Sequence, residues 1–240
     1  MQFEYAWGEE TYEFECAPNY GSKLMVDLIL SGVTYPYLDF VDDVRVILDV
    51  GANVGAAATF FARSYPDAVV YAFEPGREPF ALLAGNASRL ANVTALNFGL
   101  DAEDHSTELY HGAIDSMVAS IHPSEHTTDE AEEITLRSAR GWVEESGIER
   151  IDVLKVDTEG CEVPIFASLR ERLGGVKIIY LEYHSEADRR ELDAMLSPTH
   201  QLFFGRLVGD SGELLYLAHD LVPERAAFDI AALFRTLIPG

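Results

Sequence analysis

Short apolar runs alternate with segments of helical periodicity through the middle of the chain. The runs are typical of β-strands buried on both faces, because they are short, mostly apolar and rich in β-branched residues. They lie at 44–50, 67–73, 93–98, 151–156 and 176–183, with a further short strand expected at 134–137. Helical spacing is found at 54–64, 79–90 and 139–146. This alternation predicts an α/β fold with a mainly parallel sheet, since helices cover each right-handed crossover.

The first of these strands leads into a loop that contains two glycines. The sequence VRVILDVGANVG at 44–55 places Asp49 near the end of the strand and Gly51, Asn53 and Gly55 before the next helix. Gly51 allows a sharp turn and the close approach of a ligand, and Gly55 allows the helix to pack close to the strand. Loops of this kind bind nucleotide-like cofactors in α/β folds.

A second carboxylate ends the following strand. Glu74 comes 25 residues after Asp49, which leaves room for one crossover helix. Nucleotide-binding α/β folds place a carboxylate here against ribose hydroxyls. The dinucleotide fingerprint has a glycine where this chain has Asn53, which disfavours a bound pyrophosphate. S-adenosylmethionine has no phosphate, and its sulfonium, ammonium and ribose diol suit the acidic and amide side chains of this loop.

Two later strands bring further chemical groups to the same edge of the sheet. The stretch IDVLKVDTEGCE at 151–162 ends a buried strand with Asp157 and Glu159, and the strand at 176–183 delivers Glu182 and His184. A histidine at this edge can accept a proton near neutral pH. Asp157, Glu159 and His184 are therefore candidate catalytic residues. The alternatives are that Asp157 caps the next helix and that His184 is a hydrogen-bonded surface residue.

The charge of the chain limits its partners and its location. The net charge is −24, with 41 acidic against 17 basic residues, so we expect no binding to nucleic acid. Self-repulsion on this scale favours a host with a salty cytoplasm. We see no transmembrane run and no signal peptide, so we expect a cytoplasmic protein. The two cysteines, Cys16 and Cys161, match no metal-site spacing and are interpreted as buried thiols.

An acidic segment interrupts the pattern at 101–133. It has ten carboxylates, four histidines and neither lysine nor arginine, and its irregular spacing matches no zinc site. We interpret it as a solvated insertion in which 107–111 and 116–121 pair as a hairpin. Asp115 and Ser116, at the turn, and Asp101, at the start, are candidate cofactor-binding residues.

The two ends of the chain carry separate elements. Residues 3–7 and 12–16 predict a hairpin, and Asn19 is the expected N-cap of a helix at 23–30. We expect residues 1–43 to form an extension over the cofactor pocket, with Tyr35 lining it, and 44–240 to form the main domain. At the other end, 201–208 and 213–219 predict an antiparallel hairpin at the edge of the sheet. The amphipathic segment 226–237 predicts a closing helix or a contact in a homo-oligomer.

Three motifs together resemble the FkbM family of S-adenosylmethionine-dependent methyltransferases. They are LDVGANVG at 48–55, AFEP at 72–75 and LKVDTEGCE at 154–162. The resemblance implies a class I methyltransferase fold, which is a three-layer, doubly wound, Rossmann-like fold with seven strands of which the last is reversed. It also implies that Asp49, Gly51, Asn53 and Glu74 hold the cofactor. Thr158 and Cys161 depart from the family's usual residues and say little about the substrate.

Members of this family commonly methylate hydroxyl groups of sugars or small natural products, so the resemblance implies O-methylation of a small-molecule or glycan acceptor. In that mechanism Asp157 or His184 takes the proton of the hydroxyl group, and Glu159 orients the acceptor or the base. We assign no metal site, although Asp157, Glu159, Glu182 and His184 would suit a magnesium ion in an alternative version. Two other functions stay open: a catalytically silent protein that binds S-adenosylmethionine, and an NAD(P)-dependent oxidoreductase, which the missing glycine disfavours.

Overall fold

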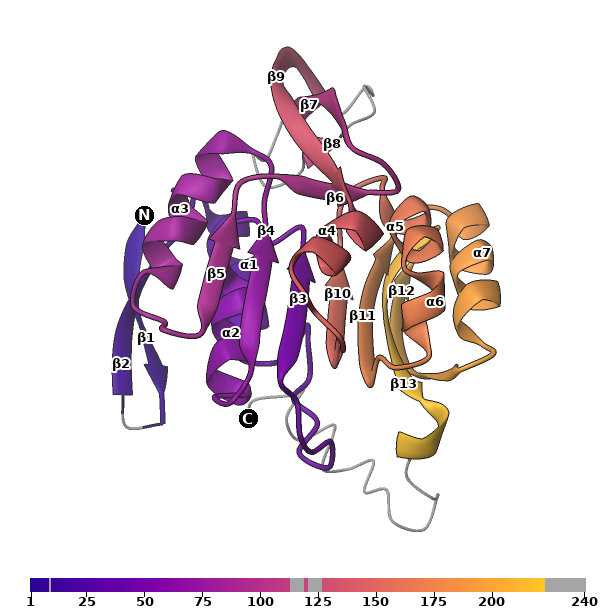
Figure 1. The fold of residues 1–240 in the computed structure, drawn as a ribbon. Coiled ribbons are helices and arrows are strands. Elements are labelled where there is room, and N and C mark those ends of the chain that lie inside the picture. The colour runs from indigo at the N-terminus through magenta and orange to yellow at the C-terminus, as the bar shows by residue number, and fades with distance from the viewer. Residues whose placement is uncertain (9, 113–118, 121–126, 223–240) are drawn as a thin grey trace.

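The computed structural model describes residues 1–8, 10–112, 119–120 and 127–222. A seven-stranded sheet runs through its centre in the order β12-β13-β11-β10-β3-β4-β5 (Figure 1). The strands are β3 (Val46–Val50), β4 (Val69–Phe73), β5 (Val93–Leu96), β10 (Val153–Val156), β11 (Ile178–Tyr183), β12 (His200–Val208) and β13 (Ser211–Ala218). Strands β3, β4, β5, β10 and β11 pair in parallel, and β13 is antiparallel to both of its neighbours. The predicted seven-stranded sheet with a reversed final strand is confirmed.

Helices cover both faces of this sheet and make the fold three-layered. On one face the buried core includes residues of α1 (Tyr20–Leu30), α2 (Ala56–Ser64) and α3 (Arg77–Ala87). The other face packs against α4 (Ala139–Glu145), α5 (Glu162–Ser168), α6 (Arg170–Leu173) and α7 (Glu186–Leu196). A short 3₁₀ turn, η1 (His219–Leu221), follows β13. No helix in the described ranges combines the length and apolar character needed to cross a bilayer.

The predicted N-terminal elements are present. Strands β1 (Gln2–Trp7) and β2 (Glu10–Glu15) pair as an antiparallel hairpin. Helix α1 begins at Tyr20, and the side chain of Asn19 accepts a hydrogen bond from the Ser22 backbone N–H, which confirms Asn19 as the N-cap. Asn86 of α3 joins this extension to the main domain, because its amide donates to the carbonyls of Glu15 and Val54, both at 2.8 Å.

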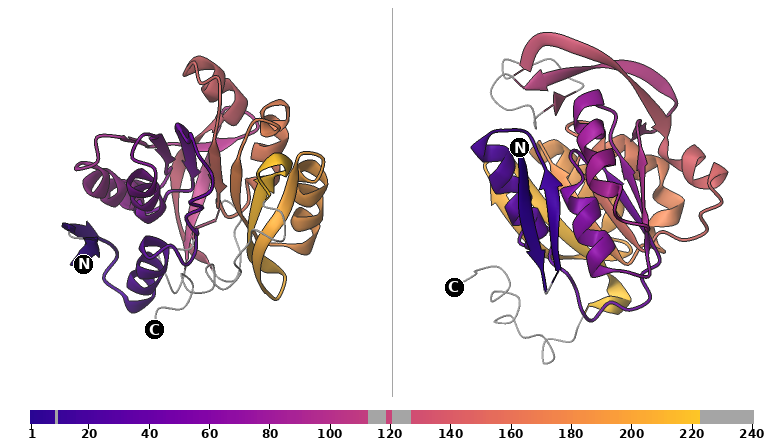
Figure 2. Two further views of the ribbon diagram at one scale, coloured as in Figure 1. Left: turned by 90° about the horizontal axis from the view of Figure 1, so that it is seen from below. Right: turned by 90° about the vertical axis from the view of Figure 1, so that its left-hand side faces the viewer.

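The acidic segment forms more structure than a solvated loop. Strands β6 (Gly99–Asp101), β7 (His105–Gly112), β8 (Ala119–Ser120) and β9 (Thr127–Ser138) form a second sheet in the order β6-β9-β7-β8. Figures 1 and 2 show the β7–β9 ribbon above the end of the main sheet where β4 and β5 terminate. The expected pairing of 107–111 with 116–121 holds for β7 and β8, but β9 is the longer partner of β7. The strand expected at 134–137 is therefore much longer than predicted. Residues 226–237 lie outside the described ranges.

Candidate functional site

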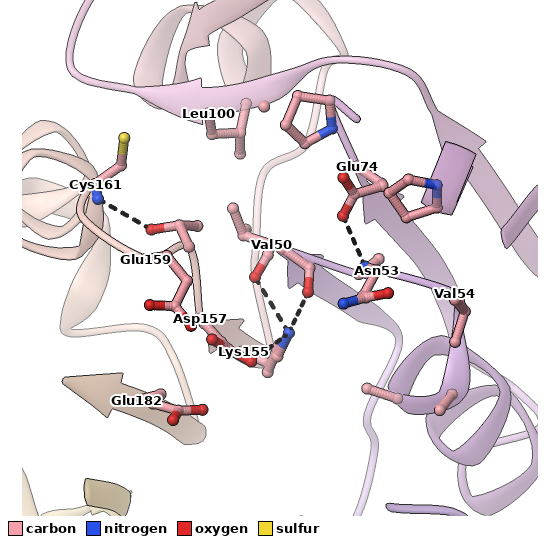
Figure 3. Close-up of a pocket in the computed structure, with 18 of the residues that line it drawn as sticks. Val50, Asn53, Val54, Glu74, Leu100, Lys155, Asp157, Glu159, Cys161 and Glu182 are labelled. Carbon is pink, nitrogen blue, oxygen red and sulfur yellow. Dashed lines mark hydrogen bonds and ion pairs between the residues drawn. The ribbon is translucent and has the colours of Figure 1, made fainter. Parts of the chain in front are cut away.

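A cavity of about 330 Å³ opens at the carboxyl ends of the parallel strands. This position follows from the topology, because the chain leaves β3 toward β4 on one side and reaches β10 on the other, and the loops diverge between them. One wall comes from the loops after β3 and β4, and the opposite wall from the loop after β10 and from Glu182 of β11 (Figure 3). The volume lies in the range of small-molecule sites.

Glu74 is held rigidly at the end of β4. One carboxylate oxygen accepts a hydrogen bond of 2.8 Å from the Asn53 backbone N–H (Figure 3). The other accepts one of 2.8 Å from the backbone N–H of Gly76. Asn53 has a φ of 48°, a left-handed conformation that asparagine adopts more readily than most residues. Burial raises the pKa of Glu74 to about 7, and the two N–H donors oppose that shift. Each oxygen can still accept a further hydrogen bond from a ligand in the cavity.

Gly51 lies where two loops of the site touch. Its φ is 78°, and a Cβ atom on it would be 1.7 Å from the backbone carbonyl oxygen of Asp157. The loop after β3 therefore approaches the loop after β10 more closely than any side chain would permit. The positive φ confirms the predicted turn, and the missing side chain makes room for the neighbouring loop; Gly51 also lines the cavity, and the approach of a ligand there stays a prediction.

Lys155 is a buried cation in the floor of the cavity. Its Nζ donates a hydrogen bond of 2.6 Å to the carbonyl of Gly51 and lies 3.2 Å from Asp49 Oδ1 and 3.5 Å from Asp157 Oδ2. Burial acts to lower the pKa of Lys155, but the charges of Asp49 and Asp157 outweigh it and raise the pKa. The amine is therefore protonated at neutral pH, and it ties together the loops that follow β3 and β10.

The loop between β10 and α5 is organised by Glu162. This side chain is 3% exposed, and its carboxylate accepts hydrogen bonds from the Thr158 N–H at 2.9 Å, the Thr158 hydroxyl at 3.0 Å and the Gly160 N–H at 3.1 Å. Glu159, at a φ of 57°, is thereby held with its Oε2 atom 3.4 Å from Nδ1 of His184. Burial raises the pKa of Glu159 to about 6, although His184 acts to lower it.

Carboxylates gather on the wall formed by β10, β11 and β13. Asp157, Glu159, Glu182 and Glu213 all line the cavity, and Glu182 and Glu213 are register partners on adjacent strands. Glu213 forms an ion pair with Arg206. The charge of Asp157, followed by burial, raises the pKa of Glu182 to about 9. Glu182 is therefore protonated at neutral pH in this structure.

Apolar side chains complete the lining. Leu109 of β7 and Ile134 and Leu136 of β9 face the cavity from the ribbon above it. Met25 and Ile29 of α1 contribute from the N-terminal extension. A ligand in this cavity thus meets apolar groups from two segments and carboxylates at both ends, which suits a molecule with a flat apolar part and several hydroxyl or cationic groups.

The chain is similar to known methyltransferases. The Methyltransferase FkbM domain matches residues 49–208 of the chain. The chain belongs to the FkbM methyltransferase family. It is 27% identical over 161 residues to the hexuronic acid methyltransferase AglP of Haloferax volcanii, in an alignment that covers 67% of this chain and 64% of AglP. It is 26% identical over 155 residues to the 2-O-methyltransferase NoeI of Sinorhizobium fredii, covering 59% of this chain and 64% of NoeI.

The chain thus spans a little under two thirds of the length of these two FkbM relatives. It is also 27% identical over 170 residues to the 31-O-demethyl-FK506 methyltransferase FkbM of Streptomyces tacrolimicus, covering 52% of this chain and 60% of that protein. Among solved structures, the fibrillarin pre-rRNA processing protein of Methanococcus jannaschii aligns over 90% of this chain and 82% of its own, with a TM-score of 0.50 and 15% identity. That likeness shows the fold alone, and it agrees with the class I methyltransferase architecture predicted from the sequence.

In this member of the FkbM family most of the predicted site residues lie around the cavity, and their roles stay predictions. Six of the predicted site residues line the cavity: Tyr35, Gly51, Asn53, Glu74, Asp157 and Glu159. His184 lies directly behind Glu159. Asp49 lies behind Lys155, where it is fully buried.

Other predicted residues lie elsewhere. A Cβ atom on Gly55 would be 2.7 Å from Leu83, so Gly55 admits α3 rather than bringing the helix close to its strand. The Asp101 carboxylate accepts a hydrogen bond from the Ala102 N–H and is 3.5 Å from His105, and it does not line the cavity. Asp115 and Ser116 lie outside the described residues.

The sequence analysis did not identify Lys155, Glu213 or the apolar residues of β7 and β9 as part of the site. Lys155 did carry a signal, because a lysine within a buried apolar strand needs a partner charge. Glu213 and Leu109 carried none, since each looks like an ordinary position of an alternating strand.

Proposed function

We propose that this chain transfers the methyl group of S-adenosylmethionine to a hydroxyl oxygen of a sugar, a glycan or a small natural product. The observation that carries the proposal is Glu74, a buried carboxylate fixed by two backbone N–H groups at the edge of the cavity. The relatives' names support the transfer to oxygen and to sugar-like acceptors, since they include a hexuronic acid methyltransferase and a 2-O-methyltransferase.

The residues present fit the proposed cofactor. Glu74 can accept hydrogen bonds from the two ribose hydroxyls, and Leu109 and Leu136 offer apolar surface beside it for the adenine ring. On the other side, Asp157 can attract the ammonium group of the methionine part. When bound, S-adenosylmethionine supplies a methyl group that its positive sulfur has already activated.

The chain's own contribution is to position the acceptor and to take its proton. The acceptor hydroxyl would lie against the wall formed by Asp157, Glu159 and Glu182. Its proton would pass to a carboxylate oxygen of Asp157 or to the imidazole of His184. Glu159, with its Oε2 atom 3.4 Å from His184 Nδ1, would stabilise the imidazolium that forms. The ribbon from β7 to β9 and helix α1 would exclude water from the reacting groups.

Calorimetric titration with S-adenosylmethionine, followed by transfer of a labelled methyl group to a panel of sugars and hydroxylated natural products, tests the proposal. We expect binding, and we expect Glu74→Gln to weaken it at least tenfold, because one backbone N–H then faces an amide NH₂ instead of an oxygen. Glu144→Gln, on the exposed side of α4, is the matched control. Binding without transfer to any acceptor would favour a silent binding protein, and binding of NADH instead would favour an oxidoreductase.

The base is tested separately. We expect Asp157→Asn and His184→Ala each to lower the rate of transfer, and the variant that lacks the base to lose about 10²-fold or more. Near-normal turnover in both variants would show that neither residue takes the proton.

A further inference from the structure

Two carboxylates and an imidazole from neighbouring strands point toward one spot beside the cavity. Asp157 follows β10, Glu182 lies in β11 and His184 follows it, and one donor atom of each lies within 4.8 Å of the other two. We propose that these three side chains bind one divalent metal ion at the acceptor end of the cavity. The inference rests on the proposed function for its role, because it assigns a metal ion to the end of the cavity where the acceptor hydroxyl would lie.

The spacing suits a single ion. Oxygen and nitrogen ligands lie about 2.0–2.6 Å from divalent ions, so two ligands of one ion are at most about 4–5 Å apart. Asp157, Glu182 and His184 meet this condition pairwise. Both carboxylates also line the cavity, so the remaining coordination positions would be open to water or to an acceptor oxygen.

His184 gives an observation that is independent of the acidic residues. Its Nε2 atom is shielded from solvent and has no hydrogen bond with any described residue. Oε1 of Glu162 is 3.6 Å away, which is too far for a hydrogen bond. A buried nitrogen in this state costs free energy, so the imidazole lacks a full set of partners and can serve as a ligand. The donor set therefore contains nitrogen as well as oxygen, which suits Mn²⁺ and similar first-row ions.

The carboxylates of Asp157 and Glu182 are not fully compensated by a positive charge. Lys155 is 3.5 Å from Asp157, but it is also shared with Asp49 and with the carbonyl of Gly51. Glu182 makes no hydrogen bond or ion pair with the described part of the chain, and its carboxylate lies within 4.8 Å of that of Asp157, close enough for two negative charges to repel each other. A divalent ion would remove this repulsion and keep both carboxylates ionised. It would also lower the pKa of a hydroxyl group bound to it. Asp157 and His184 would then act as ligands, and the proton of the hydroxyl group would pass to the carboxylate of Glu159, which lines the same wall.

Titration of the chelator-treated full chain with Mn²⁺, followed by electron paramagnetic resonance of the free ion, tests the inference. The titration is done without S-adenosylmethionine and in 0.5 M KCl, which screens weak binding to the acidic surface. We expect one Mn²⁺ per chain, and we expect Glu182→Gln and Asp157→Asn each to weaken binding at least tenfold. Glu144→Gln should leave it unchanged, and circular dichroism confirms that each variant is folded.

Three outcomes would overturn the inference: no binding of one equivalent at submillimolar Mn²⁺, binding that the variants of Asp157 and Glu182 leave unchanged, or competition by methylammonium as effective as that by Mg²⁺. The last result would show a site for a protonated amine of the acceptor. Calorimetry with S-adenosylmethionine on the same samples separates the two proposals. Cofactor binding without Mn²⁺ binding contradicts the metal site alone, and Mn²⁺ binding without cofactor binding contradicts the proposed function alone.

Discussion

Asp49 and Lys155 are register partners on the adjacent parallel strands β3 and β10, and their charged atoms lie 3.2 Å apart in the interior of the protein. Asp49 is 0% exposed and Lys155 is 2% exposed. Burial raises the pKa of Asp49, and the charge of Lys155 is the largest of the effects that oppose this shift. Because Lys155 also binds the Gly51 carbonyl, the pair connects the core of the sheet to the loop that is expected to hold the cofactor.

Removing one partner of this pair should be costly. We expect Lys155→Met to lower the free energy of unfolding by about 3–5 kcal/mol, because Asp49 would keep a buried charge without a cation. The double variant Asp49→Asn, Lys155→Met should recover most of that loss, since the fully buried partner then carries no charge and Asp157, the other partner of Lys155, is partly exposed. Urea unfolding of the three proteins measures both effects. A single variant that costs less than about 1 kcal/mol would show that the pair does not stabilise the sheet.

Gly51 should not tolerate a side chain. We expect Gly51→Ala to cost more than about 3 kcal/mol of stability and to abolish cofactor binding, because its Cβ would be 1.7 Å from the Asp157 carbonyl oxygen. Gly147→Ala is the matched control, since Gly147 also has a positive φ, of 65°, but nothing lies within 4 Å of its added Cβ. The control measures the cost of the backbone conformation alone, which is about 1 kcal/mol. Equal losses in the two variants would contradict the close contact of the two loops.

The stability of the protein without cofactor or metal should fall as the pH rises. The pKa of Glu182 in the folded state is about 9 and that of Glu74 is about 7, whereas an unfolded chain has glutamate pKa values near 4.3. The folded state therefore binds more protons than the unfolded state between these values. The stabilisation is complete below about pH 4.3 and is lost as the pH rises through 7 and 9.

Thermal melts of wild type and Glu182→Gln between pH 5 and 9 check this prediction. Glu182→Gln cannot ionise, so its melting temperature should fall less steeply and should exceed that of wild type at pH 9. One pKa unit corresponds to about 1.4 kcal/mol, and 1 kcal/mol shifts the melting temperature of a domain of this size by about 2–4 °C. Each pKa unit of the shift is thus worth about 3–6 °C, so the expected difference at pH 9 is at least several degrees. Identical pH profiles would show that Glu182 ionises as an ordinary glutamate.

Salt should stabilise the protein. With a net charge of −24 the folded chain repels itself, and salt screens that repulsion because the Debye length falls from about 10 Å at 0.1 M to about 3 Å at 1 M. We expect the melting temperature to rise between 0.1 M and 1 M KCl. Sucrose at matched osmolarity is the control, because it strengthens burial without screening charge. A melting temperature that responds equally to the two additives would contradict a charge effect.

The strands and helices of the main sheet, and the chemical groups that end its parallel strands, could be predicted from local sequence. Strand β3, the glycine loop, Glu74 after β4 and Asp157 after β10 could all be read from runs of fewer than fifteen residues. They could be read because local periodicity decides which strands are buried, and because parallel strands place their carboxyl ends at one edge. The reversed β13 followed in the same way from an alternating pattern and from the family resemblance.

Only the tertiary structure decided which of these groups meet. The pairing of Asp49 with Lys155 depends on β3 and β10 being neighbours, and the contact of Gly51 with Asp157 depends on the same adjacency. The acidic segment gave no sign that β9 would extend to Thr127 or that Leu109 would face a cavity. The physical reason is that burial and charge compensation are properties of neighbours in space. Residues separated by about a hundred positions acquire them only when the sheet is assembled.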